Sequence, residues 1–409
     1  MSYREIVTRP VLIWGAVAVG ARMPVAMAPL SLVFLVRERP GGYTLGAVLA
    51  AVYVIGEIVG APVLGMRMRP ERARPQLAVG LAVGAAAFAA LGAANSANPV
   101  VLGVFAFLAG AGPAAAPGGL RAVLTGMVPE RAVTRAMSLE SVLVFGIWAV
   151  APAAATSLAL SVAPYVPLLL AGTLMAAAVA GLWALPAGWQ SERETGAESM
   201  LRAIARAWPV YVTGAAGLTL LALAELILPA LLDQRSIGIG WAGPLLAGFS
   251  IGSALGAFVY GLRSWPGRLP TQSLVLLFGV SGCVALVAFT PWTGGIAAGL
   301  VVAGVLQAGA MLTRTLTLRE MLPPSALAAG YSVMYAAVGA GYAASGSLAG
   351  GLLRIVAPST AILAGVGLTV VLTLTGAAGE RWISRTRAAG AVGAEGAPVD
   401  RRRDPECRL

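Results

Sequence analysis

The chain has 409 residues, of which 58% are hydrophobic and 11% charged, and its mean hydropathy is +0.84. A soluble chain carries roughly a quarter charged residues, so the composition excludes an ordinary soluble domain and predicts a membrane protein. The net charge is +11, there is no histidine, and the two cysteines are Cys283 and Cys407. This inventory excludes a disulfide framework and a zinc site built from Cys and His.

Twelve apolar runs are long enough to cross a bilayer, which requires about 20 mostly apolar residues in a helix. They cover residues 11–36, 43–66, 77–95, 99–128, 137–162, 164–185, 209–233, 243–262, 271–290, 293–313, 326–353 and 355–378. The first run continues to Val36, which is too long for the apolar region of a cleaved signal peptide. We therefore expect an all-α membrane protein with twelve transmembrane helices.

The arginines are distributed unevenly between the two sides of these helices. If the N-terminus is inside, the outer connections hold only Arg37, Arg39, Arg235 and Arg354, and most of the others fall on the inner side. Cytoplasmic loops carry an excess of basic residues, so both termini are expected to be cytoplasmic. The positive charge is then a topology signal, and we expect no nucleic-acid partner.

The longest internal gap divides the chain into two halves of six helices. We expect an N-terminal bundle at 1–185, a cytoplasmic central loop at 186–208, a C-terminal bundle at 209–378 and a disordered cytoplasmic tail at 379–409. Within the loop, Leu201, Ile204 and Trp208 fall on one helical face. That pattern fits a short amphipathic helix on the membrane surface or a solvated linker.

A twelve-residue segment recurs in the two halves. Gly56-Glu57-Ile58-Val59-Gly60-Ala61-Pro62-Val63-Leu64-Gly65-Met66-Arg67 matches Gly252-Ser253-Ala254-Leu255-Gly256-Ala257-Phe258-Val259-Tyr260-Gly261-Leu262-Arg263 at six positions. Small residues four positions apart let two helices approach closely in lipid. A membrane chain built from two similar halves is typical of secondary transporters. Gly65, Arg67, Gly261 and Arg263 are candidate residues of cytoplasmic gating loops.

The 6+6 plan, the central loop and this repeat resemble the major facilitator superfamily over about residues 5–378. Val128-Pro129-Glu130-Arg131-Ala132 and Leu322-Pro323-Pro324-Ser325-Ala326 repeat a second motif after the fourth and tenth helices. More narrowly, Ala21-Arg22-Met23-Pro24 and the segments 252–256 and 259–267 resemble uncharacterised actinobacterial members. The resemblance implies two pseudo-symmetric six-helix bundles and a multi-pass permease of the bacterial plasma membrane.

The chain also departs from the superfamily's patterns. Gly65 is kept in the loop after the second helix, but Arg69 stands where the superfamily usually has a latching Asp, and only Glu71 is available to substitute. The arginine that drug/proton antiporters tend to carry in the fourth helix is replaced by Ala106. In the fifth-helix motif, Pro152 is kept and the glycines are lost. The fold resemblance is therefore stronger than the resemblance to proton antiporters.

Three ionisable residues are expected well inside the hydrocarbon region, where a charge costs at least ~2.5–3.5 kcal/mol. Arg22 and Glu57 lie at equal depth on adjacent helices, about 21 Å below the outer surface, so they could pair. The repeat places Ser253 opposite Glu57, so the shared scaffold does not require a carboxylate there. Glu225 falls in the seventh helix. We expect Arg22, Glu57 and Glu225 to serve in coupling or substrate binding. The alternative is a structural ion pair for Arg22 and Glu57, and for Glu225 a polar contact to a neighbouring helix or a side chain that extends outward to the membrane surface.

Uncharged polar residues give weaker signals. Tyr53, Gln307, Tyr331 and Tyr335 could line a cavity or pack against neighbouring helices. Glu140 and Asp233 are expected near the membrane interfaces as solvated or capping residues. Lysine is absent, so no phosphate-binding loop of the Gly-x-x-x-x-Gly-Lys type exists and we expect no ATP, cofactor or metal.

The favoured function is proton-coupled efflux of a small organic molecule by alternating access, in a monomer. The alternative is an importer or uniporter of a small metabolite, with Arg22 binding an anionic group. The third hypothesis is a membrane sensor or scaffold, or a membrane-embedded enzyme. We expect no enzyme, because no buried nucleophile-and-base arrangement is apparent. We expect no scaffold, because Arg22 and Glu57 would be unnecessary in its core.

Overall fold

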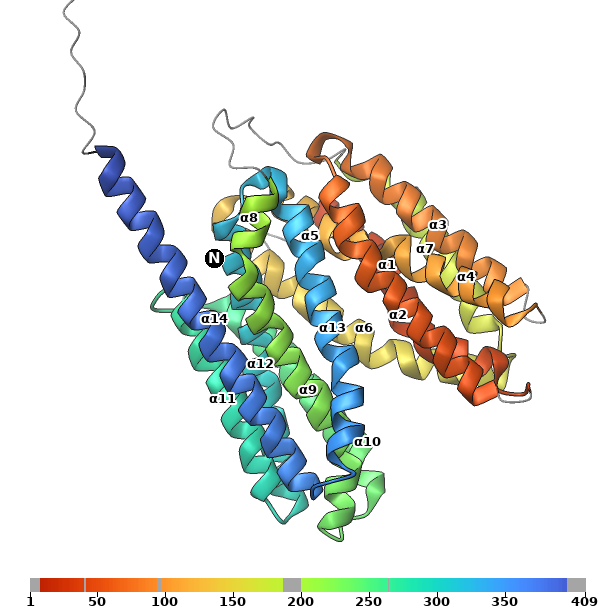
Figure 1. Cartoon of the computed structure of the whole chain (residues 1–409). Helices are drawn as coiled ribbons and strands as arrows, with labels where there is room; N and C mark the ends of the chain where they lie inside the picture. The colour runs from red at the N-terminus through yellow and green to blue at the C-terminus, as the bar shows by residue number, and fades with distance from the viewer. Residues whose placement is uncertain (1–7, 40–41, 94–96, 187–199, 264, 396–409) are drawn as a thin grey trace, which may run out of the picture.

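The computed structural model describes residues 8–39, 42–93, 97–186, 200–263 and 265–395, and within these ranges the regular structure is entirely helical (Figure 1). Ten helical segments are long and apolar enough to span a membrane. Of the two remaining apolar runs, one forms the shorter apolar helix α7 (Val166–Leu182), and the other forms α13 (Leu327–Leu352), which is long enough to span but less apolar. Each of the twelve runs therefore forms a helix in the part of the chain that the structure describes. The predicted fold class is confirmed, while the side on which the termini lie stays a prediction.

The first six spans form the N-terminal half of the molecule (Figure 1). Their helices are α1 (Arg9–Val36), α2 (Gly42–Arg67), α3 (Ala73–Ala93), α4 (Pro99–Ala111), α5 (Ala116–Met127), α6 (Val133–Ser161) and α7. Helices α4 and α5 form one span, interrupted by the 3₁₀ turn η3 (Pro113–Ala115). Pro113 and Pro117 each lack a backbone N–H donor, which breaks the regular α-helical pairing at this point.

The remaining helices form the C-terminal half and its approach. They are α8 (Met200–Arg206), α9 (Trp208–Gln234), α10 (Ala242–Leu262), α11 (Leu269–Phe289), α12 (Thr293–Met321), α13 and α14 (Pro358–Glu395). The short α8 falls where the sequence suggested an amphipathic helix. Its Ile204 is buried but its Leu201 is exposed, so the proposed apolar face is only partly covered.

The repeated glycines have the same packing role in both halves. A Cβ atom placed on Gly56 or Gly60 would lie 2.5 Å from the carbonyl oxygen of Phe107 or Ala111 in α4. In the second copy, Gly252 and Gly256 would meet the carbonyl oxygens of residues 301 and 305 in α12 at 2.3 Å. Only glycine permits such an approach of backbone to backbone, so α2–α4 and α10–α12 are equivalent close pairs.

The internal repeat continues into the loop that follows each copy. Gln76 Nε2 donates to the carbonyl oxygen of Arg67 at 2.9 Å, and its Oε1 accepts from the backbone N–H of Arg69 at 2.8 Å. Gln272, at the same offset of 196 residues, donates to the carbonyl oxygens of Trp265, Pro266 and Gly267 at 3.1 Å. A glutamine from the next helix therefore fixes the backbone of both loops.

The two halves meet along α2 and α13 and along α6 and α10, with α5 also packed on α13. Contacts between the halves lie at the end that carries residues 68–72, 128–132, 265–268 and 322–326, which we call the closed end. There Val133 and Met137 form one apolar cluster with Tyr260, Leu312 and Leu316 of the other half. At the opposite end, Arg39 binds Ala97 O at 3.0 Å and Arg235 binds Ala288 O at 2.7 Å, each within one half.

The last helix is longer than the sequence suggested. The structure continues α14 to Glu395, so the expectation of a disordered tail from Gly379 is wrong for residues 379–395, and residues 396–409 lie outside the described ranges. Its continuation carries Glu380, which binds the buried Arg314 of α12, and Gly379 packs against Trp208. Tertiary contacts to α12 and α9 therefore stabilise a segment with no clear apolar periodicity.

Candidate functional site

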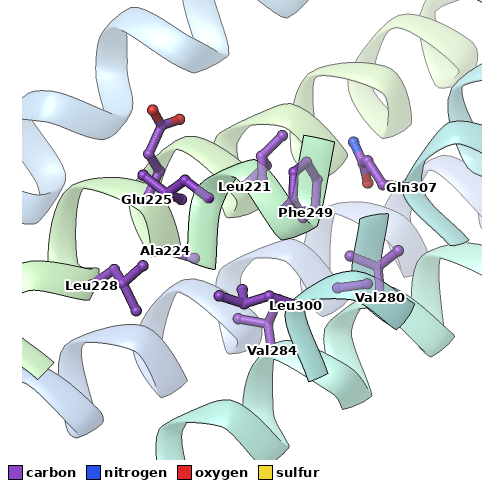
Figure 2. A pocket seen from close by; sticks show the side chains of 11 residues that line it. Leu221, Ala224, Glu225, Leu228, Phe249, Val280, Val284, Leu300 and Gln307 are labelled. Atoms are coloured by element: carbon purple, nitrogen blue, oxygen red, sulfur yellow. The ribbon is translucent and has the colours of Figure 1, made fainter. Parts of the chain in front are cut away.

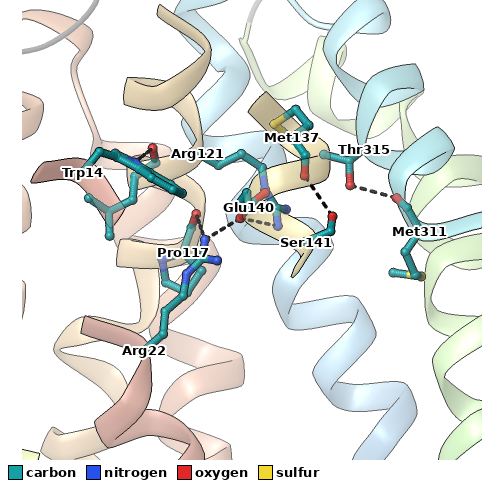
Figure 3. A network of polar contacts seen from close by, with 10 residues as sticks. Trp14, Arg22, Pro117, Arg121, Met137, Glu140, Ser141, Met311 and Thr315 are labelled. Atoms are coloured by element: carbon teal, nitrogen blue, oxygen red, sulfur yellow. Dashed lines mark hydrogen bonds and ion pairs between the residues drawn. The ribbon is translucent and has the colours of Figure 1, made fainter. Parts of the chain in front are cut away.

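Three charged side chains meet in the interior of the N-terminal half (Figure 3). Glu140 of α6 is 1% exposed and accepts hydrogen bonds from two arginines. Arg22 Nη2 of α1 lies 2.6 Å from Glu140 Oε1, and Arg121 of α5 donates from Nε and Nη2 at 2.8 Å. Arg22 Nη2 also reaches the carbonyl oxygen of Pro117 at 3.3 Å. We call Arg22, Arg121 and Glu140 the charge cluster.

The charge cluster has more positive than negative charge. Two guanidinium groups share one carboxylate, and Arg22 is only 7% exposed. Its Nε and Nη1 atoms are buried and have no hydrogen-bond partner among the described residues. A buried charged group is costly unless it is paired and hydrogen-bonded, so this surplus could be balanced by an anionic ligand.

Two expectations about these residues are wrong. Glu140 is neither solvated nor a cap, because α6 begins at Val133 and is preceded by the turn η4 (Glu130–Ala132). Seven helical residues carry Glu140 about 10 Å into the bundle. Arg22 does not pair with Glu57 either. The helix faces separate them, since Arg22 faces α5 and α6 while Glu57 faces α13.

Glu57 makes its polar contact across the two halves. The Tyr335 hydroxyl of α13 donates to Glu57 Oε1 of α2 at 3.0 Å. One helical turn earlier on α13, the Tyr331 ring lies 5.4 Å from the guanidinium carbon of Arg121, within cation–π distance. Helix α13 therefore places two tyrosines against ionisable groups of the other half, and one of them touches the charge cluster.

The internal repeat shows that Glu57 is not a scaffold requirement. Its counterpart Ser253 is fully buried, and its hydroxyl donates to the carbonyl oxygen of Phe249 in its own helix at 3.0 Å. Tyr53, one turn before Glu57, is also fully buried and packs on Phe88 with ring centroids 6.2 Å apart. Tyr53 is thus a core residue of the N-terminal half rather than an exposed cavity residue.

Glu225 and Gln307 lie apart from the charge cluster, inside the C-terminal half (Figure 2). Both border a cavity of about 20 Å³ whose other walls are apolar side chains such as Leu228, Phe249 and Val284. In Figure 2 the Glu225 carboxyl group points away from these walls. The Gln307 amide is 1% exposed and lacks a partner among the described residues. The cavity is large enough for about one water molecule, which the amide could bind.

The candidate gating residues lie where the halves touch or close to that place. A Cβ atom on Gly65 would lie 2.4 Å from Ser332 Cβ of α13, so this glycine makes room for the other half. Arg67 is the last residue of α2, Gly261 is buried near the end of α10, and Arg263 directly follows α10. Gly65 is the member of this group with an established contact between the halves.

The sequence reasoning missed several residues that join the halves. Gly118 of α5 lies against the same serine, since an added Cβ would meet Ser332 Oγ at 2.5 Å and Ala328 O at 2.9 Å. Ser138, which corresponds to Ser332 in the repeat, donates to Ala257 O of α10 at 2.5 Å. Comparing α6 with α13 along the repeat could have revealed this serine pair.

Two ion pairs made by arginines of α12 were also missed. Arg319 binds Glu130 of the other half through two contacts of 2.5 and 2.7 Å. Arg314 of α12 is 1% exposed and binds Glu380 and, at 3.2 Å, Thr213 Oγ1. Neither acidic partner lies in an apolar run, so hydropathy gave no signal for these pairs.

Comparisons with solved structures establish the fold. The chain is similar to the human organic anion transporter MFSD10 (TETRAN), with a TM-score of 0.71 and 13% identity over 90% of this chain and 99% of that one. It is similar to the E. coli fucose:proton symporter FucP, with a TM-score of 0.70 and 13% identity over 90% and 97% of the two chains. It is also similar to a bacterial homologue of the iron transporter ferroportin, with a TM-score of 0.69 and 14% identity over 93% of this chain and 99% of that one.

No protein-family model and no curated protein matches the sequence. At 13–14% identity the structural likeness establishes the major facilitator fold, and it does not carry over a substrate, a coupling ion or a direction of transport. The narrower resemblance to actinobacterial members stays a prediction from the sequence.

Proposed function

We propose that the protein is a secondary active transporter that moves a small organic molecule across the plasma membrane by alternating access, coupled to protons and directed outward. The observation that carries the proposal is the Glu57–Tyr335 contact. An ionisable carboxyl group lies inside a candidate span and hydrogen-bonds across the two halves. Protonation of Glu57 would change this contact, and thereby the free-energy difference between closed and open arrangements.

The arrangement of the halves supports this proposal. They are joined at the closed end by packing, hydrogen bonds and an ion pair, contacts that can break without unfolding either bundle. Fold neighbours include a proton symporter and an organic anion transporter. If the arginine bias gives the orientation, the closed end is cytoplasmic and the structure is an outward-facing state.

The test is an efflux assay with Glu57 variants. Compounds that raise the melting temperature of the purified protein identify a candidate substrate, which is then loaded with the protein into vesicles under an imposed pH gradient. We expect Glu57→Gln to abolish gradient-driven transport and to keep counterflow, because the carboxyl group can no longer exchange a proton. Tyr335→Phe, which removes only the hydroxyl donor, should reduce transport without abolishing its pH dependence.

Matched variants decide the outcome. Glu225→Gln is tested in the same assay, because a second carboxyl group could share the coupling. Tyr43→Phe, at an exposed tyrosine near the start of α2 and away from Glu57 and Glu225, serves as the control for loss of a hydroxyl group. Gradient-driven transport at the wild-type rate in both Glu57→Gln and Glu225→Gln would overturn proton coupling through these carboxylates.

The alternative function is import or facilitated passage of a small anionic metabolite. It is favoured by the surplus positive charge of the charge cluster and by the two Arg22 nitrogens that have no hydrogen-bond partner among the described residues. Under this alternative, Arg22→Gln lowers affinity for an anionic substrate about tenfold or more, because a charge-assisted hydrogen bond is lost. Uptake of matched anionic and neutral compounds checks this, and equal effects on both classes would contradict it.

A further inference from the structure

A hollow of about 570 Å³ lies at the closed end, outside the charge cluster. One wall is formed by residues 66–70 and Arg72, at the end of α2 and in the loop before α3, together with Gln76. Glu71 is exposed in the same loop but is not among the residues that line the hollow. The other wall contains Met200 of α8 and Ser325 of the turn η6 (Pro324–Ala326), which leads into α13. The hollow is therefore bounded by both halves of the molecule.

Three arginines line the hollow: Arg67, Arg69 and Arg72. All three are exposed, and no ion pair with an acidic residue is found for them within the described ranges. The lining residues include neither Asp nor Glu. The opposite wall contributes Ser325 of η6, whose hydroxyl group can donate a hydrogen bond. The positive charge of one wall and this donor on the other favour an anion.

The loop presents these arginines from a fixed backbone. Gln76 binds the loop at Arg67 O and at the Arg69 N–H, while Met68 and Pro70 are buried beneath it. A backbone held in this way loses little conformational entropy when a ligand binds, which favours a preorganised site over a mobile charge run.

The second copy of the loop shows that the scaffold does not require all three arginines. Residues at the offset of 196 are Arg263, Trp265 and Arg268. Trp265 stands in place of Arg69, stacks on Tyr260 with ring centroids 5.7 Å apart, and donates to Tyr260 O at 3.1 Å. The glutamine and the proline are shared, so the charge at Arg69 is a specific feature of the first copy.

We propose that this hollow binds a phosphate-type oxyanion, which bridges the arginines of the first loop to Ser325 of η6. Guanidinium groups bind phosphate oxygens through paired, charge-assisted hydrogen bonds. Because the two walls belong to different halves, the bridge forms only while the closed end is closed, and the ligand stabilises that arrangement. The source is either a soluble phosphate or the phosphodiester of an anionic lipid headgroup.

The first experiment measures binding of inorganic phosphate to the purified full chain by equilibrium dialysis at constant ionic strength. The test variant is the double substitution Arg69→Gln and Arg72→Gln. Its control is Arg131→Gln with Arg268→Gln, which removes the same charge from exposed positions that do not line the hollow. We expect one site in the wild type and in the control, and at least about tenfold weaker binding in the test variant.

The second experiment tests whether the bound anion holds the two halves together at the closed end. Met137 is buried between the halves at the closed end, so a Met137→Cys probe in a Cys283→Ser, Cys407→Ser background reacts with a soluble maleimide only when this end opens. We expect inorganic phosphate to slow labelling in the probe protein and in the control, and to leave the Arg69→Gln, Arg72→Gln variant unchanged. Phosphate also stabilises buried surfaces in general, but this effect should be the same in the probe protein, the control variant and the test variant.

A third experiment, in lipid, distinguishes a soluble phosphate from the phosphodiester of a lipid headgroup. The same labelling is measured in nanodiscs of phosphatidylglycerol and of phosphatidylcholine without phosphate. Slowing by phosphatidylglycerol that depends on Arg69 and Arg72 supports the lipid source, and slowing by inorganic phosphate alone supports the soluble one. The proposed site would be overturned if the test and control double variants bound phosphate equally, or if the wild type bound none. Binding without slower labelling in either arm would overturn the bridge between the halves.

Discussion

At the scale of single residues, Glu140 is the only acidic partner that the described residues show for Arg22 and Arg121. Both guanidinium groups touch its carboxylate, and Arg121 also lies against Tyr331 of the other half. The loss of one arginine would leave one ion pair intact. The loss of the Glu140 charge leaves two cations without a counter-charge in the bundle, which is the more costly change.

We therefore predict that Glu140→Gln lowers the free energy of unfolding by about 3–5 kcal/mol, the usual cost of leaving buried charges unpaired. The measurement is thermal or denaturant unfolding in detergent. Asp233→Asn, at an exposed carboxylate near the end of α9, is the control and should change stability little. Adding Arg121→Gln to Glu140→Gln should recover part of the loss, and a further loss there would contradict the charge-balance argument.

At the scale of helices, α13 packs against the N-terminal half because two glycines there leave space for one of its side chains. Ser332 fits between Gly65 of α2 and Gly118 of α5. The surroundings of the two glycines differ. The nearest atoms to an added Cβ at Gly65 belong to the Ser332 side chain, whereas Gly118 also faces the backbone atoms Ala328 O and Ser332 N at 2.9 Å.

We predict that Gly65→Ala and Gly118→Ala both open the closed end, because overpacking costs about 1–3 kcal/mol. The rate of maleimide labelling at the Met137→Cys probe measures the opening. Ser332→Gly should restore slow labelling in Gly65→Ala but not in Gly118→Ala, where the clash with backbone remains. Gly103→Ala, whose added Cβ meets no atom within 4 Å, is the control. Rapid labelling in Gly103→Ala would contradict the assignment to this interface.

The sequence predicts the helices well and their buried charges poorly. Hydropathy locates the spans because crossing a bilayer requires long apolar runs, and glycine spacing identifies the α2–α4 and α10–α12 contacts. Glu140 was misplaced because hydropathy puts the start of α6 at 137 and the structure puts it at Val133. The partner of Arg22 depends on the rotation of α1 about its axis. Glu380 acquires its partner because α14 packs on α9 and α11, which brings its carboxylate to Arg314 of α12. Hydropathy carries no information on either.

At the scale of the whole molecule, the closed end is held by contacts of unequal strength. The apolar cluster of Val133, Met137, Tyr260, Leu312 and Leu316 removes several large side chains from water, each worth about 1.5–3 kcal/mol when fully buried. The Arg319–Glu130 ion pair lies at the rim, where the Glu130 side chain is 79% exposed. Exposed ion pairs contribute about 0.2–1 kcal/mol, so packing should dominate the closure.

This ranking gives a prediction for the ion pair between the halves. Arg319→Gln should raise the labelling rate at the Met137→Cys probe by no more than about fivefold, the equivalent of 1 kcal/mol in an equilibrium constant. Arg319→Glu should have a larger effect through repulsion from Glu130, and the charge swap Arg319→Glu with Glu130→Arg should restore the slow rate. Raising the salt concentration should reduce all of these differences, because the pair is exposed and is screened. An opening in Arg319→Gln as large as that in Gly118→Ala would show that the rim charge, and not the packed interior, holds the two halves together.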